Sequence, residues 1–393
     1  MLSFLVFGRR AHLLPPIEPT LPEPVPMPES PPAAPALKDW FDRARYEHIA
    51  DELSVLHPRF DRQRFLKISL QGLNELSLMQ RLRRMTESLH ATLPADYLQT
   101  LDLLRGLAPH INHNFVSLVL PDYVGQYGLD HFDASLAALK DFTVYGSSEF
   151  AIREYLRRDL KRTLKVMRTW SQDEHEGVRR LASEGCRPRL PWSFRLEALI
   201  ADPSPVMPIL ENLKADKSLY VRKSVANHLN DITKDHPDWM LDRVEAWSLE
   251  NPHTAWIVRH ALRTLIKKGD PRALAIIGAG EKAKVKVTDF SLSPTHIQLG
   301  QKIQFTLNLQ SLSNQSQRLV VDYAIHYVKK SGSASAKVFK WKELTLPADA
   351  SISLTRQQMI KDFTTRVHHA GHHEVEILIN GESLARSGFD LVK

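Results

Sequence analysis

The sequence predicts a mainly α-helical protein, in which a solenoid of paired helices is followed by a smaller β-sandwich. Two observations carry this prediction. From about Lys38 to Ile277, apolar residues recur at steps of three and four residues, which is the period of amphipathic helices. Beyond GAGEKAK (278–284), short segments alternate apolar and polar residues between turns rich in Gly, Ser, Asn and Asp. That alternation is typical of half-buried strands.

The helical half contains an internal sequence repeat. VRRLA begins at Val178, VRKSVA at Val221 and VRHAL at Val258, so the intervals are 43 and 37 residues. Such intervals match two-helix HEAT or armadillo units, and Ile152-Arg153 suggests a further, compressed copy. We expect each copy to place an arginine early in the second helix of its pair. These arginines either brace neighbouring repeats or form a ladder along one surface, and the pattern leaves both open.

The C-terminal segments predict about seven short strands. This number of strands in residues 284–393 suggests a sandwich of immunoglobulin-like type, although the chain lacks the paired cysteines of antibody domains. The segments are KVTDFSLSP, KIQFTLNLQ, RLVVDYAIHYV, AKVFKWKELTL, SISLTRQQ, HEVEILIN and ESLARSGFDLV.

Three parts follow along the chain. Residues 1–36 hold ten of the 24 prolines, a composition that forms neither a helix nor a core, so we expect a disordered tail there. Residues 37–280 form the helical domain and residues 284–393 the β-sandwich.

Charge and cysteine content narrow the class of protein. The net charge of +7 favours a polyanion such as nucleic acid as partner. No apolar run is long enough to span a membrane, and Arg9 and Arg10 follow the apolar MLSFLVF instead of preceding it, unlike a secretory signal. The single cysteine, Cys186, excludes an internal disulfide framework and a cysteine-built zinc site. We therefore expect a cytoplasmic protein.

Cations are concentrated in residues 153–168. We expect one amphipathic helix with a basic side that follows DNA phosphates, the alternative being an ordinary solvated face. The cations of this segment are Arg153, Arg157, Arg158, Lys161, Arg162, Lys165 and Arg168. Further cations that would line the repeats toward DNA are Arg179, Arg180, Arg187, Arg189, Arg222, Lys223, Arg259 and Arg263.

The segment 181–199, LASEGCRPRLPWSFRLEAL, is the best candidate for a site. Gly185 suits the end of one helix and Ser193 the start of the next, while the prolines between them stiffen the loop. A rigid loop of this kind would bring a carboxylate, an indole and two cations together. The histidines of 368–373 lie in the predicted β domain and are interpreted as a histidine-rich turn, and those of 110–113 form a short isolated pair, so we expect no metal. No phosphate-binding glycine loop is present either.

Three stretches resemble the AlkC branch of the HEAT-like alkylpurine DNA glycosylases. They are SSEFAIREYL, VRRLASEGCRPRLPW and VRKSVANHLNDITKDHPD. The resemblance covers most of residues 38–277, and the β domain is similar to the immunoglobulin-like extension of that branch. It implies an enzyme of base excision repair, and a monomer suffices for that activity. Such an enzyme removes cationic N3-alkylated bases, chiefly 3-methyladenine and 3-methylcytosine, from double-stranded DNA without flipping the nucleotide and without a metal or cofactor.

The same resemblance places the active-site acids at Glu149, Glu184 and Asp231, with Trp192 beside them. Preorganised carboxylates would stabilise the positive charge that develops on the sugar as the base leaves, and one could orient water. We expect Asp231 to serve the sugar or the water and Glu184 to give electrostatic support.

Structural alternatives remain for each of these acids. Glu184 could end its helix bonded to Arg187, Asp231 could pair with Lys234, and Glu149 could belong to a helix cap. The rival functions are a non-catalytic HEAT scaffold that binds DNA or an acidic protein, and an enzyme of the same fold that prefers 7-alkylpurines.

Overall fold

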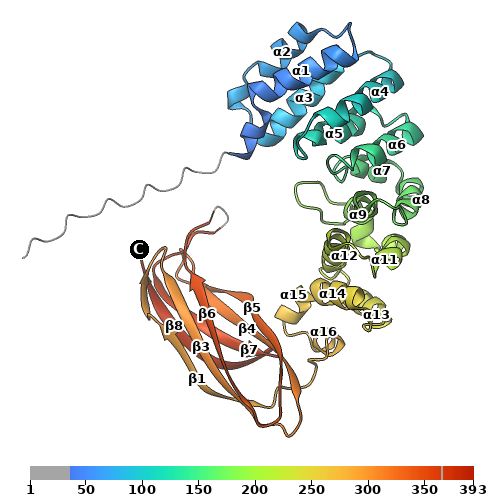
Figure 1. The fold of residues 1–393 in the computed structure, drawn as a ribbon. Coiled ribbons are helices and arrows are strands. Elements are labelled where there is room, and N and C mark those ends of the chain that lie inside the picture. The colour runs from blue at the N-terminus through green and yellow to red at the C-terminus, as the bar shows by residue number, and fades with distance from the viewer. Residues whose placement is uncertain (1–35, 364–365) are drawn as a thin grey trace, which may run out of the picture.

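The computed structural model describes residues 36–363 and 366–393. A curved array of helices is followed by a β domain that lies beside the C-terminal end of the array (Figure 1). The predicted tail at 1–36 falls outside the described residues except for Ala36. Within the described ranges, no helix has the length and apolar character needed to cross a membrane.

The helical part begins at Leu37 and ends at Ile276. Its α-helices are α1 (Arg43–Leu56), α2 (Arg62–Leu70), α3 (Leu78–Thr92), α4 (Tyr97–Leu107), α5 (Val119–Tyr127), α6 (Phe132–Phe142), α7 (Ile152–Arg158), α8 (Leu160–Trp170), α9 (Glu176–Glu184), α10 (Glu197–Ala201), α11 (Met207–Leu213), α12 (Leu219–Ile232), α13 (Pro237–Glu245), α14 (Pro252–Ala261), α15 (Arg263–Lys267) and α16 (Pro271–Ile276). Short 3-10 helices are η1 (Leu37–Phe41), η2 (Leu73–Glu75), η3 (Ala108–His110), η4 (Val116–Leu118) and η5 (Ser204–Val206).

Local signals set many of these helix starts. The side chains of Asp61, Asp96 and Asp270 each accept a hydrogen bond from the backbone N–H three residues on, which satisfies a donor that the first turn leaves unpaired. Pro237 and Pro252 occupy first helical positions, where the missing N–H costs nothing. These caps divide a continuous periodic pattern into separate helices.

The helices follow one another in an arc. In Figure 1, α9, α12 and α14 lie side by side on the inner side that faces the β strands, and α8, α11 and α13 lie on the outer side. One hydrophobic cluster runs through the whole array, from Phe41 in η1 to Ile277 after α16. Each helix pair therefore buries its apolar face against its neighbours along the chain.

The repeated Val-Arg pairs do not all occupy equivalent positions. Val178 and Val221 are the third residues of α9 and α12, as the repeat predicts. Val258 is instead the seventh residue of α14, because Asn251 and Pro252 start that helix earlier. The expectation of an early position is therefore wrong for the third copy, although all three valines are buried.

The segment 152–168 is not one helix. Asp159 ends α7 and begins α8, where its side chain accepts a hydrogen bond from the backbone N–H of Arg162 at 3.0 Å. The single amphipathic helix expected from the run of cations is therefore wrong, and the cations are divided between two short helices.

The β domain consists of two sheets, as expected of a sandwich. Strands β1, β3 and β6 form one sheet, and the other has the order β2-β8-β7-β4-β5. Phe305 and Tyr323 lie in the core between the sheets, with ring centroids 5.1 Å apart. The strands are β1 (Val285–Ser293), β2 (His296–Gln298), β3 (Lys302–Ser311), β4 (Gln317–Val328), β5 (Ala334–Leu346), β6 (Ser351–Met359), β7 (Gly371–Ile379) and β8 (Glu382–Val392). All seven expected segments form strands, and β2 is additional.

Close backbone packing joins the two parts. A Cβ built on Gly381, in the turn between β7 and β8, would lie 2.6 Å from the Cα of Gly269, which follows α15. The neighbouring Asn380 donates from its side-chain amide to the carbonyl of Glu281 at 3.0 Å. Glu343 of β5 also pairs with Arg259 of α14 at 3.3 Å. These contacts hold the β domain directly against the end of the helical array.

Candidate active site and DNA interface

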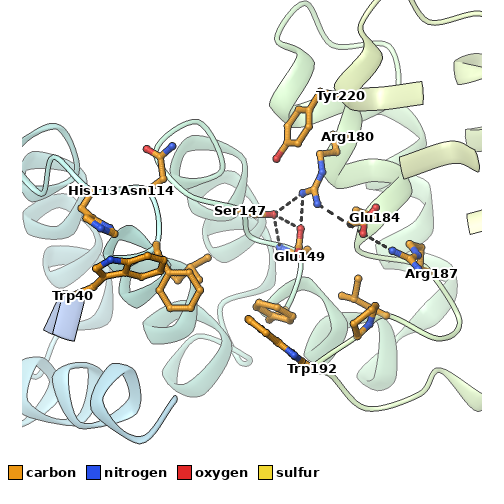
Figure 2. Close-up of a pocket in the computed structure, with 15 residues that line it drawn as sticks. Trp40, His113, Asn114, Ser147, Glu149, Arg180, Glu184, Arg187, Trp192 and Tyr220 are labelled. Atoms are coloured by element: carbon orange, nitrogen blue, oxygen red, sulfur yellow. Dashed lines mark hydrogen bonds and ion pairs between the residues drawn. The ribbon is translucent and has the colours of Figure 1, made fainter. Parts of the chain in front are cut away.

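An open pocket of about 520 Å³ is lined in part by the loops before α7 and after α9 (Figure 2). Its volume falls in the range of ligand-binding pockets. Three of the four residues predicted to be catalytic line it, while Asp231 does not. The lining residues are Trp40, His113, Asn114, Phe115, Leu118, Ser147, Glu149, Phe150, Arg180, Glu184, Arg187, Leu190, Pro191, Trp192 and Tyr220.

Glu149 is held by the loop that precedes α7. Ser148 anchors this loop by donating its hydroxyl to the carbonyl of Leu139 at 2.7 Å. Ser147 donates its hydroxyl to Oε2 of Glu149 at 2.6 Å, and Arg180 reaches the same oxygen at 2.5 Å. The carboxylate is thus fixed by a side-chain pair and not by a helix cap.

Glu184 is the last residue of α9. Gly185 follows it at the helix end, as predicted, and glycine is needed there because a Cβ would come within 2.4 Å of the side chain of Ile152. The close contact between α7 and the end of α9 therefore brings Glu184 next to Glu149.

Two arginines alternate with the three predicted acids. Arg180 contacts Glu149 at 2.5 Å and Glu184 at 3.7 Å. Arg187 contacts Glu184 at 2.6 Å and Asp231 at 2.9 Å. We call these five residues, in the order Glu149, Arg180, Glu184, Arg187 and Asp231, the acid–arginine chain. Figure 2 shows its first four members along one side of the pocket.

Burial and charge act together in this chain. Glu184 and Asp231 are only 5% and 3% exposed, and a buried carboxylate requires a paired cation. Burial opposes the charged form of Arg187, but Glu184 and Asp231 outweigh it and raise its pKa. Glu149 and Glu184 likewise raise the pKa of Arg180 against the effect of burial.

Asp231 differs from the other two acids. Its Oδ2 accepts from Arg187 and its Oδ1 accepts from Lys234 at 3.0 Å. The ion pairs that could give these acids a structural role are both present, since Glu184 bonds Arg187 and Asp231 pairs with Lys234. These contacts leave Asp231 behind the pocket wall, with Arg187 between it and Glu184.

Trp192 stands at the tip of the loop between α9 and α10. Its side chain is 70% exposed, and its φ of 65° lies in the left-handed region, which is unusual for a bulky residue. The loop is closed by a hydrogen bond from the backbone N–H of Leu196 to the carbonyl of Pro188 at 3.1 Å. Leu196, and not the predicted Ser193, precedes the first residue of α10.

Arg153 holds this loop from inside the protein. It is 0% exposed and donates to the carbonyls of Gly185 at 3.1 Å and Arg187 at 2.6 Å, and also to the carbonyl of Phe194. Burial lowers the pKa of Arg153 to about 10. The prediction that Arg153 contacts phosphate is wrong, because its guanidinium is enclosed by the loop that carries Trp192.

The repeated arginines brace the array. Arg179 donates to the carbonyls of residues 173 and 174 and pairs with Asp216, and Arg222 donates in the same way to the carbonyls of residues 216 and 217. Arg179 and Arg187 are 8% and 7% exposed and pair with Asp216 and Asp231, and their contacts with phosphate stay predictions. Arg259 pairs with Glu343 of the β domain. Lys223 lies on α12 and is exposed.

The other predicted DNA contacts remain predictions. Arg157, Arg158 and Arg162 pair with Glu154, Asp130 and Asp133. Lys161, Lys165 and Arg168 lie on α8, on the outer side of the arc (Figure 1). Arg189 pairs with Asp235, and Arg263 bonds Asn227.

Sequence reasoning missed one side of the pocket. Trp40 comes from η1, and His113 and Phe115 come from the turn before η4. The ring of Tyr220 stacks against Arg180, with its centroid 4.6 Å from Cζ of the guanidinium. The aromatic residues near 40 and 113 were visible in the sequence, but nothing in their spacing relates them to Glu184.

Histidines and the cysteine have structural surroundings. His373 stacks on Phe389 and His368 contacts Asp362, and the described residues contain no cluster of three or more potential metal ligands. Burial raises the pKa of Cys186 to about 12, which disfavours a nucleophilic thiolate.

Comparisons with known proteins place this architecture. Residues 129–265 match the family model described as DNA alkylation repair enzyme, and residues 286–393 match the C-terminal Ig-like domain of YhaZ. The *Bacillus subtilis* (strain 168) protein YhaZ is 43% identical over 347 residues, which cover 88% of this chain and 96% of YhaZ.

A solved structure extends the similarity to the whole fold. It is the *Pseudomonas fluorescens* alkylpurine DNA glycosylase AlkC bound to DNA containing an abasic site analog. The sequence identity is 57% and the TM-score 0.89, over 91% of this chain and all of that one. Because the identity is this high across both the helical part and the Ig-like domain, the chain belongs to the AlkC family of alkylpurine DNA glycosylases.

Proposed function

We propose that this protein is a monomeric DNA glycosylase of base excision repair. It hydrolyses the N-glycosidic bond of cationic N3-alkylated bases, 3-methyladenine and 3-methylcytosine, in double-stranded DNA. The observation that carries this proposal is the acid–arginine chain along one wall of an open pocket, beside the exposed indole of Trp192. A relative with a solved complex, AlkC of *P. fluorescens*, binds DNA that contains an abasic site analog.

The pocket suits a reaction that develops positive charge on a sugar. A base alkylated at N3 already carries a positive charge and leaves readily, so the sugar becomes cationic as the bond to C1′ breaks. The arginines occupy Oε2 of Glu149 and Oε1 of Glu184. The other oxygen of each carboxylate has no hydrogen bond to the described side chains and is free to face the sugar. Fixed carboxylates in this position would stabilise the transition state without reorganisation.

The three acids then take different roles. Glu149 and Glu184 line the pocket, so we propose that they stabilise the cationic sugar and orient the attacking water. Asp231 is 3% exposed, and both of its oxygens accept hydrogen bonds. We therefore propose that it positions Arg187 and does not make the direct contact with the sugar or the water that is expected from the sequence. Trp192 offers an exposed ring face for a cation–π contact with the alkylated base.

We further propose that the arc is a HEAT-like repeat array that holds DNA on its inner side, against the β domain. The support comes from cations that converge on His260 of α14. Burial lowers the pKa of His260 to about 4, with further lowering from Arg263, Lys223 and Lys340 of the β domain. Arg263 also donates to the carbonyl of His260 at 2.6 Å, and Lys340 pairs with Glu343. Cations from both parts of the chain thus act on one side chain, and we infer that a phosphate binds beside it.

The test is release of 3-methyladenine and 3-methylcytosine from duplex DNA under single-turnover conditions. We expect Glu149→Gln, Glu184→Gln and Trp192→Ala to bind DNA but to release base more slowly, by about 100-fold for the acids. Glu250→Gln is the matched control, because Glu250 is an exposed acid outside the pocket, and its rate should equal that of the wild type.

Two outcomes would redirect the proposal. A wild-type protein that binds DNA and releases neither base would be a scaffold and not an enzyme. Faster release of 7-methylguanine than of either N3-alkylated base would keep the reaction and change the substrate.

A further inference from the structure

Opposite the acid–arginine chain, the pocket is bounded by three aromatic side chains. Trp40 packs against His113 with ring centroids 5.1 Å apart and against Phe115 at 5.2 Å, tilted by 54° in both cases. We call Trp40, His113 and Phe115 the aromatic wall. In Figure 2, Trp40 and His113 lie across the cavity from Arg180 and Glu184. All three rings are partly exposed and line the pocket.

The aromatic wall is held in place by helix α1. Arg45 donates to the carbonyl of Ile111 at 2.8 Å, and Nε2 of His48 bonds the carbonyl of His110 at 2.8 Å. Between these contacts and His113, Asn112 adopts a φ of 53°, a left-handed conformation that asparagine tolerates better than most residues. The turn is therefore fixed at two points before it presents His113 to the pocket.

Polar groups of defined direction border the rings. The backbone N–H of Val116 donates to Nδ1 of His113 at 3.2 Å. Burial and the nearby Arg45 lower the pKa of His113, so the neutral ring carries its proton on Nε2 and is a donor there. Asn114, which is exposed beside it, adds an amide that both donates and accepts.

We propose that the aromatic wall is a second binding subsite, which stacks an unpaired nucleobase of the bound DNA through Trp40 and contacts its edge through His113 and Asn114. An exposed ring with hydrogen-bonding groups at its border is how proteins hold unstacked bases. The pocket extends from this wall to Glu149 and Glu184, so a base on Trp40 would lie near the sugar on which the carboxylates act. The inference rests on the proposed function and adds to it a site for a base beyond the one that is cleaved.

The test uses two duplexes of one sequence, one fully paired and one with a single unpaired adenine, neither of them alkylated. The quantity measured is the ratio of the two Kd values at one salt concentration, in which phosphate contacts common to both duplexes cancel. We expect the wild type to bind the bulged duplex more tightly. Trp40→Leu, which keeps apolar bulk but has no ring, should lower this preference by about tenfold, while Trp40→Phe should keep most of it.

Trp239→Ala is the matched control. Trp239 is a partly buried tryptophan of α13 outside the pocket, and its loss should leave the ratio at the wild-type value. A wild type without any preference for the bulged duplex would overturn the subsite, as would a Trp40→Leu variant with the full preference. Neither result depends on base release, so failure of the subsite and failure of the glycosylase proposal are read from separate measurements.

Discussion

Asp231 in the helical part and Asp322 in the β domain are equally hidden from solvent but differ in their partners. They are 3% and 5% exposed. Asp231 contacts Arg187 at 2.9 Å and Lys234 at 3.0 Å. Oδ1 of Asp322 has no hydrogen-bond partner in the part of the chain that the structure describes. Burial raises the pKa of Asp322 to about 6, and the lowering effects of Lys267 and Lys340 compensate only in part.

The difference shows what the acid–arginine chain does. Burial alone disfavours an ionised carboxyl group, while a guanidinium in direct contact stabilises it. Three acids close together would also repel one another, and Arg180 and Arg187 stand between them. The helical part thus concentrates carboxylates that are paired with arginines where a cationic transition state would need them, whereas Oδ1 of Asp322 is buried without a partner among the described residues.

The largest effect should come from removing Arg187. Arg187→Met leaves Glu184 and Asp231 buried without their shared cation, which should lower the free energy of unfolding by about 3 to 5 kcal/mol. Base release should fall on the order of 100-fold, because Glu184 is no longer held in position. Thermal unfolding and single-turnover base release measure the two effects. A folded variant with wild-type release would show that Arg187 does not position the acids.

Removing Arg153 should have the next largest effect. Arg153→Met leaves the carbonyls of Gly185, Arg187 and Phe194 without their donor, which should cost about 2 to 3 kcal/mol of stability and loosen the loop of Trp192. Faster tryptic cleavage after Arg189 and Arg195 would report this loosening. Arg158→Met, which removes an exposed cation of the same helix, is the control. Equal cleavage rates in the two variants would contradict the bracing role.

Periodicity predicted most of the fold, and its failures have local causes. Strand β2 was missed because three residues, His296–Gln298, are too few to display alternation. The break at Asp159 was missed because cations continue on both sides of it, although aspartate is a common helix-start residue. In both places a short-range feature interrupted a pattern that was assessed over a longer window.

The site was predictable only in part. Gly185 and the stiff loop marked Glu184 and Trp192 as neighbours along the chain, and the family resemblance added Glu149 and Asp231. The contact of Arg187 with Asp231 spans 44 residues, and Trp40 meets the pocket through tertiary packing alone. Arg153 was misread because an arginine in a basic run is normally exposed, and its burial depends on carbonyls of a distant loop.

A smaller effect is expected at Asp322, with a defined dependence on pH. The folded carboxyl takes up a proton near pH 6, whereas its ordinary pKa is 3.8. The unfolded chain therefore holds fewer protons between these values, and wild-type stability falls as the pH rises through this window. Asp322→Asn should raise the free energy of unfolding by about 2 kcal/mol at pH 7 and change it little at pH 4. Urea unfolding at both pH values checks this, and an equal gain at both would exclude titration as the cause.

The smallest effect on stability should come from the exposed pair of Arg189 and Asp235, since exposed pairs contribute about 0 to 1 kcal/mol. Arg189 borders Trp192 on the loop, so it remains a proposed phosphate contact. Arg189→Gln should lower the slope of log Kd against log salt concentration by about one. Lys67→Gln removes one exposed cation on α2, on the outer side of the arc, and should leave the slope unchanged. If the two variants change the slope equally, DNA does not distinguish the inner side from the outer side, and the proposed binding face is wrong.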